Sequence, residues 1–270
     1  MTDVTQEEDL EDAKMPLLDH LVELRNRLMY SLAALFVAFL FCYYFSQDIY
    51  AFLLEPLADI LGEGRRMIYT NLTEAFFTYV KVAFWAACFL SFPVIASQLW
   101  LFIAPGLYRQ EKRAFLPFLV ATPFLFFLGG AMVYYFIFPL AWRFFLGFEQ
   151  VPGTSELAIE FEGRVGEYLS LVMTLIFAFG IAFQLPVLLT LLVRVGMVSV
   201  DALARKRKYA VVIILTAAAV LTPPDVISQV GLGIPLYLLY EVSILIGRRI
   251  EKDRLRREAA EAAEEGATTV

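Results

Sequence analysis

The chain has 270 residues, of which 60% are hydrophobic and 19% are charged, and its formal net charge at pH 7 is −6. A soluble domain is nearer about 45–50% apolar, with about 25% charged residues. The apolar excess also gathers in runs of about 20 residues, the length that an α-helix needs to cross a bilayer. The composition therefore excludes an ordinary soluble domain. A transmembrane β-barrel is excluded as well, because the runs are apolar on every side rather than alternating.

Both ends of the chain are polar and rich in acidic residues. We expect residues 1–14 to form a disordered acidic tail, 15–250 a single membrane domain, and 251–270 a charged tail. The hydrophilic start predicts that there is no cleavable signal peptide. Cys42 and Cys88 lie inside apolar runs, where neither a disulfide framework nor a metal site is indicated.

Six apolar segments follow one another along the chain. They are Leu28–Phe45, Ala75–Phe102, Ala114–Phe138, Tyr168–Val193, Tyr209–Leu221 and Gln229–Gly247. Prolines inside them predict kinked helices, because proline removes an N–H and clashes with the carbonyl four residues earlier. The fifth segment reaches only about 20 Å, short of the roughly 30 Å hydrocarbon core. We predict an all-α polytopic membrane protein with six transmembrane helices, of which the fifth and sixth are short.

The lysines and arginines beside the segments predict the orientation of the chain. If the N-terminus is cytoplasmic, the outer side holds only Arg65, Arg66, Arg143 and Arg164, and most of the other basic residues fall inside. An odd number of spans would put the basic tail after Arg248 outside. We therefore expect six spans with both termini in the cytoplasm.

Polar residues in two places are candidates for a site. The stretch 17–28 has the pattern of an amphipathic helix, on which Glu23 and Arg27 are spaced to form a surface ion pair. Taken alone, these residues favour a merely solvated helix face.

Within the apolar segments, Lys81 and Glu241 lie near segment ends, where snorkelling towards the interface explains them. Gln184 lies deeper, just before Pro186. It could bond a carbonyl that the proline frees, or it could be a docking point for another helix, and both readings stay open.

The residues needed for known membrane enzymes are missing from the pattern. An intramembrane serine protease needs a serine and a histidine together, but the one histidine, His20, precedes the first segment. Paired intramembrane aspartates, metal-ligand clusters and phosphate-binding glycine loops are also absent from the sequence. We predict that the chain is not an enzyme, and we expect no catalytic residue, metal, cofactor or nucleic-acid partner.

Several short motifs occur in a fixed order along the chain. They are His20–Leu28, Pro56–Leu57, Phe102–Tyr108, Glu111–Arg113, Ala182–Pro186 and Leu221–Val226. Together they resemble the TatC family of the twin-arginine protein translocase, whose N-terminal motif reads HLxELRxRL and whose hairpin motif reads TPPD. The resemblance covers about residues 15–250, and the combination is far more specific than any one motif.

The resemblance implies a receptor for twin-arginine signal peptides of folded proteins, in a bacterial inner membrane and driven by the proton gradient. Glu23 and Glu111 would bind the arginines, which suits carboxylates because each guanidinium offers a planar fork of donors. The same patch would include His20, Leu24, Arg25 and Phe102.

The resemblance also implies contacts beyond the signal peptide. Gln184 stands where the family often has glutamate, at a position implicated in contact with single-span partners of the TatA and TatB type. Pro56 and Asp225 match outer-side residues linked to function. Self-association in a complex and contact with membrane lipids are expected as well.

Two other functions stay as alternatives at this stage. A six-helix solute transporter would need a polar site near the bilayer midplane, for which only Gln184 and Gln98 are available. A structural scaffold for membrane assembly would need no site at all.

Overall fold

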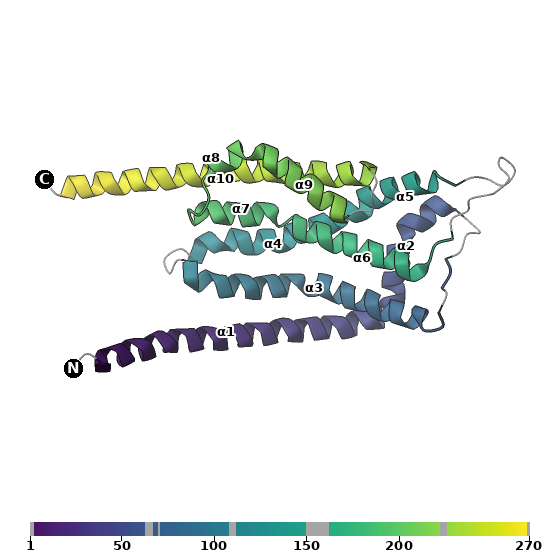
Figure 1. Ribbon diagram of the computed structural model, residues 1–270, viewed down its shortest axis with the longest axis horizontal. Helices are drawn as coiled ribbons and strands as arrows, with labels where there is room; N and C mark the ends of the chain where they lie inside the picture. The colour runs from purple at the N-terminus through teal and green to yellow at the C-terminus, as the bar shows by residue number, and fades with distance from the viewer. Residues whose placement is uncertain are drawn as a thin grey trace. The chain divides into compact units, whose positions relative to one another are not determined.

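The computed structural model describes residues 3–62, 67–69, 71–107, 112–149, 162–221 and 226–268. Its elements are α1 (Asp3–Tyr44), α2 (Ser46–Leu61), α3 (Glu74–Leu107), α4 (Lys112–Met132), the π-helix η1 (Val133–Ile137), α5 (Phe138–Leu146), α6 (Val165–Ala182), α7 (Leu185–Arg194), α8 (Val200–Arg205), α9 (Arg207–Leu221) and α10 (Val226–Thr268) (Figure 1). In these ranges the one β pairing is an isolated bridge. The prediction of an all-α fold is confirmed.

Among the residues that the structure describes, five helical stretches are long and apolar enough to cross a membrane. They are His20–Tyr44, Glu74–Phe102, Pro117–Leu146, Val165–Arg194 and Gln229–Arg256. The chain is therefore a multi-pass membrane protein by length and composition. With 15 residues, α9 is about 22 Å long, and its crossing of the membrane stays a prediction.

The ends of the chain differ from the sequence expectations. The predicted short sixth helix is wrong, because α10 has 43 residues and continues through the charged stretch to Thr268. That stretch is rich in alanine, glutamate and arginine, which are strong helix formers. At the other end, α1 begins at Asp3, so residues 3–14 are helical where a disordered tail was expected.

The chain folds as two compact units. The first comprises Met1–Ile49 and Tyr79–Pro123, and the second comprises Tyr50–Thr78 and Phe124–Val270. In the first unit α1 and α3 run side by side (Figure 1). Small residues at their contact, Ala38 and Cys42 on α1 with Ala83 and Ala87 on α3, let the two backbones approach closely.

A hydrogen bond joins α3 to α4 in the first unit. The Trp100 Nε1–H donates to Thr122 Oγ1 at 2.8 Å, and the threonine hydroxyl donates in turn to the Phe118 carbonyl at 2.8 Å. The part-buried indole N–H keeps a partner in this way, as a polar group in apolar surroundings requires.

The core of the second unit is built on aromatic side chains and glycines. Phe126, Phe138 and Phe179 are fully buried. A Cβ on Gly129 would lie 2.7 Å from the Phe179 carbonyl oxygen, so only glycine lets α4 approach α6 this closely. In the same unit α10 packs along both α7 and α9 (Figure 1).

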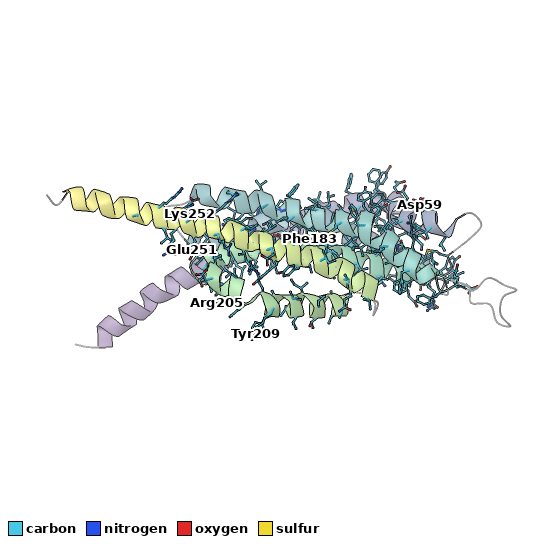
Figure 2. All side chains as sticks on the ribbon, turned by 90° about the horizontal axis from the view of Figure 1, so that it is seen from above. Asp59, Phe183, Arg205, Tyr209, Glu251 and Lys252 are labelled. Atoms are coloured by element: carbon cyan, nitrogen blue, oxygen red, sulfur yellow. The ribbon has the colours of Figure 1, made fainter. Side chains whose placement is uncertain are left out.

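Two interruptions of regular helix precede prolines, and one of these prolines, Pro186, lies in a segment where the sequence predicts a kink. The π-helical stretch 133–137 ends just before Pro139, and the break between α6 and α7 at 183–184 precedes Pro186. Phe183 marks this break in Figure 2. Each proline lacks the N–H that would continue the hydrogen-bond pattern. By contrast, α10 continues through Pro235.

In the second unit, the segment that precedes α3 forms main-chain hydrogen bonds with the segment that precedes α6. Ile68 N–H donates to the Gly163 carbonyl at 3.0 Å, and Val165 N–H donates to the Ile68 carbonyl at 3.1 Å. The Glu74 carboxylate accepts from Gly166 N–H at 3.3 Å, so it caps the N-terminus of α6. The start of α6 is thereby held against the start of α3.

Candidate functional site

Near the start of the apolar part of α1, a carboxylate forms an ion pair with a guanidinium. Glu23 and Arg27 lie one helical turn apart, so their side chains share a face. Arg27 Nε donates to Glu23 Oε1 at 3.0 Å, and Arg27 Nη2 donates to the same oxygen. The Glu23 side chain is 35% exposed and that of Arg27 is 22% exposed. The ion pair expected from the spacing of these two residues is confirmed.

An aromatic pair lies one turn before this ion pair. The His20 ring on α1 stacks on the Phe102 ring of α3, with centroids 4.3 Å apart and ring planes 19° apart. His20 is exposed and Phe102 is half-buried. Because His20 precedes Glu23 by three residues, the aromatic pair and the carboxylate share one face of α1. The structure thus brings three of the predicted site residues together.

Two further predicted residues lie on α1. Leu24 and Arg25 are exposed, and Arg25 Nη2 donates to Asn26 Oδ1 at 3.3 Å. Leu24 follows His20 by four residues and so shares its face of the helix, whereas Arg25 follows Glu23 by two residues and does not share the face of Glu23. Glu111, the second predicted carboxylate, lies outside the described residues.

Gln184 lies at the break between α6 and α7 in the second unit. Its main-chain N–H donates to the Ile181 carbonyl at 2.9 Å rather than to the carbonyl four residues earlier. That earlier carbonyl, of Gly180, instead accepts from Gln184 Nε2 at 3.4 Å. The side-chain amide therefore serves a carbonyl that the break frees, and contact of Gln184 with a partner helix stays a prediction.

Pro56 lies within α2, and its predicted place on the outer side of the membrane stays a prediction. Since proline has no N–H, the Phe52 carbonyl four residues earlier receives no helical hydrogen bond. The Tyr134 hydroxyl donates to this carbonyl at 2.7 Å and lies 3.2 Å from Glu55 Oε2. Pro56 therefore leaves the Phe52 carbonyl of α2 free to accept a hydrogen bond from Tyr134 of η1. Asp225, the other predicted residue of this kind, lies outside the described residues.

The chemistry that these groups support is non-covalent. In the described ranges, no three His, Cys, Asp or Glu side chains gather as a metal site would require. At the α1 face, a partly exposed carboxylate beside a stacked aromatic pair is suited to binding a cation that carries apolar neighbours.

The model of the family "Sec-independent protein translocase protein (TatC)" matches residues 19–235. The chain belongs to the TatC family. The TatC protein of Magnetococcus marinus is 54% identical over 253 residues, covering 94% of this chain and 91% of that relative. The TatC protein of Escherichia coli (strain K12) is 41% identical, covering 90% and 92%. A crystal structure described as the twin arginine translocase receptor TatC superposes with a TM-score of 0.71 at 38% identity, covering 86% of this chain and 99% of that one.

Membership of the TatC family establishes that this is a Sec-independent protein translocase subunit of a protein-transport family. The motif-based assignment from the sequence is confirmed. The His20–Leu28 motif and Gln184 both fall inside the matched range.

Sequence reasoning missed one polar cluster of this TatC chain. Arg207, the first residue of α9, donates from Nε to Glu241 Oε1 at 2.7 Å and from Nη2 to Oε2 at 2.9 Å. The Tyr237 hydroxyl, one turn earlier on α10, donates to Glu241 Oε1 at 3.0 Å. Arg205 and Tyr209, labelled in Figure 2, mark the positions two residues on either side of Arg207. Glu241 is therefore half of a bidentate ion pair rather than a snorkelling side chain.

Proposed function

We propose that this TatC chain binds the twin-arginine signal peptides of folded proteins, with Glu23 and Glu111 as the carboxylates that receive the paired arginines. The observation that carries the proposal is the state of Glu23. Its carboxylate is partly exposed and already binds one guanidinium, that of Arg27. A carboxylate held in this way is matched to arginine, whose planar fork a lysine ammonium does not reproduce.

The neighbouring side chains suit the rest of such a ligand. A signal peptide carries an apolar segment after its charged start. The stacked rings of His20 and Phe102 offer apolar contact area, and so does the exposed Leu24, four residues after His20 on α1. Arg25 would contribute to the same patch by interacting with the polar groups of the peptide main chain.

The test is a binding titration in detergent or nanodiscs with a signal peptide that carries Arg-Arg or Lys-Lys. Glu23→Gln and, separately, Glu111→Gln are expected to weaken binding of the Arg-Arg peptide roughly tenfold, because each removes a charge-assisted hydrogen bond. Glu167→Gln is a matched control, since Glu167 also pairs with a nearby arginine, Arg164 just before α6, but belongs to the other unit. Wild-type affinity in both site variants would overturn the assignment of these carboxylates.

The chain would act in a complex in a bacterial inner membrane, with both termini in the cytoplasm and with transport driven by the proton gradient. Its partners would be single-span proteins of the TatA and TatB type and further copies of TatC. Gln184 is the residue we assign to partner contact within the membrane, and Pro56 and Asp225 are assigned to the outer side. Membrane lipids would surround the apolar faces, and no enzymatic step, cofactor or nucleic acid is involved.

A further inference from the structure

The carboxylate assigned to the signal peptide is occupied within the chain itself. The Arg27 guanidinium donates two hydrogen bonds to Glu23, and both reach Oε1. The two residues lie at the i and i+4 positions of one continuous helix, so the pair forms without any other part of the protein. Arg27 thus presents to Glu23 the same chemical group that a twin-arginine ligand would bring.

We propose that Arg27 is an internal competitor for the signal peptide and sets the affinity of the Glu23 site. This inference rests on the proposed function. An incoming arginine exchanges with Arg27 on Glu23 rather than meeting a free carboxylate, and a peptide without such a cation leaves the internal pair in place. Arg27 sets the affinity of the site in this scheme by acting through Glu23, and the peptide is not required to touch it.

The energetics of the pair make this exchange practical. Glu23 and Arg27 are both partly exposed, and pairs at this helical spacing are weak, so an external guanidinium can displace the internal one. Weak pairing of this kind lowers the apparent affinity for a competing cation by roughly two- to fivefold. The competition acts on the free protein alone, so it lowers the affinity for every cationic ligand by the same factor. The ratio between Arg-Arg and Lys-Lys peptides is unchanged by it.

The experiment measures peptide affinity for the full chain carrying Arg27→Gln, which keeps the length and helix propensity of the side chain but removes the guanidinium. The expected result is a two- to fivefold rise in affinity for both the Arg-Arg and the Lys-Lys peptide, with their ratio preserved. Arg27→Lys is expected to give a smaller rise, because a single ammonium still competes, though less well.

Testing Arg27→Gln in a chain that also carries Glu23→Gln distinguishes competition for Glu23 from a general effect of the changed net charge. In the Glu23→Gln chain the internal pair is already lost, so adding Arg27→Gln is expected to leave affinity unchanged within error. Arg164→Gln, which removes a guanidinium from an ion pair in the other unit, is the control for net charge and should not alter affinity. The unfolding temperature of each variant establishes that it is folded.

Three outcomes overturn the inference. They are a fall in affinity with Arg27→Gln, no change, or an equal rise in both the wild-type and the Glu23→Gln backgrounds. Failure of the proposed function is distinguishable from all three, because then the wild-type chain shows no preference for the Arg-Arg peptide and Glu23→Gln alone has no effect.

Discussion

At the scale of single residues, a missing N–H explains a contact that joins two helical elements, α2 and η1. Pro56 leaves the Phe52 carbonyl without its helical donor, and the Tyr134 hydroxyl takes that place at 2.7 Å. The two rings also stack, with centroids 4.4 Å apart and planes 7° apart. A carbonyl shielded from water that loses its partner costs up to about 1–3 kcal/mol, and the part-buried Tyr134 hydroxyl offsets this cost.

We predict that Tyr134→Phe destabilises the protein by about 1–2 kcal/mol, because it strands the Phe52 carbonyl. The same substitution should cost markedly less in a Pro56→Ala background, where a main-chain N–H can donate to that carbonyl. Thermal unfolding in detergent measures the four free energies of this double-mutant cycle.

Tyr168→Phe supplies the control for this cycle. The Tyr168 hydroxyl donates to the Leu53 carbonyl at 3.0 Å, but Leu57 keeps the N–H that serves Leu53 in a regular helix. Tyr168→Phe should therefore lower the free energy of unfolding by less than Tyr134→Phe does, and by the same amount with Pro56 and with Pro56→Ala. An equal cost of Tyr134→Phe with and without Pro56 would show that the proline does not create the acceptor.

At the scale of helices, the short α9 is attached to α10 by its first residue. Arg207 forms a bidentate ion pair with Glu241, and Tyr237 holds the same carboxylate. The Gln229 amide also donates, from Nε2 to the Leu215 carbonyl of α9 at 3.1 Å. Helices of about 15 residues gain most of their stability from packing, so such attachments decide whether α9 stays ordered.

We predict that Arg207→Gln raises the hydrogen-exchange rate of the first amides of α9 roughly two- to fivefold, since it removes both bonds to Glu241. Glu241→Gln should have a similar effect, and the double variant should add little to either single change. Arg164→Gln, which breaks the ion pair with Glu167 at the start of α6, is expected to leave α9 unaffected. Full additivity of the two changes would mean that the pair does not act as a unit.

The sequence predicts those features of the helices that depend on residues within about one helical turn of each other. Spacing along one helix predicts the Glu23–Arg27 pair, and Pro186 predicts the break beside Gln184, because both effects act within one turn. The helix α2 was missed because it is short and contains Pro56, which indicates a loop. The Arg207–Glu241 pair joins residues 34 positions apart, and no local pattern reports such a contact.

In the candidate site, too, local sequence patterns predict contacts within one helix but not contacts between helices. The stacking of His20 on Phe102 joins two helices, and only the resemblance to a family put the two residues in one patch before the structure did. The length of α10 was underestimated because counting apolar residues stops at Gly247. The residues that follow are helix formers, and they continue the helix without being apolar.

At the scale of the whole molecule, the number of membrane crossings depends on α9 alone. Five stretches are long and apolar enough to cross by themselves, and five crossings would put the two termini on opposite sides of the membrane. At about 22 Å, α9 needs a locally thinned bilayer or flanking basic residues that snorkel, and Arg205–Lys208 at its start meet the second condition. The distribution of basic residues favours the crossing, since it keeps the basic part of α10 on the cytoplasmic side.

We therefore predict that the two ends of α9 are accessible from opposite sides of the membrane. Single cysteines at Met197, before α8, and at Val226, after α9, test this in a chain whose native Cys42 and Cys88 are replaced by alanine. Both positions are 73% exposed, so a membrane-impermeant thiol reagent can reach them. In intact cells with a permeabilised outer membrane, Val226→Cys should react and Met197→Cys should react only after lysis. Reaction of both from the same side would mean that α9 does not cross, and the chain would then have five spans with its termini on opposite sides.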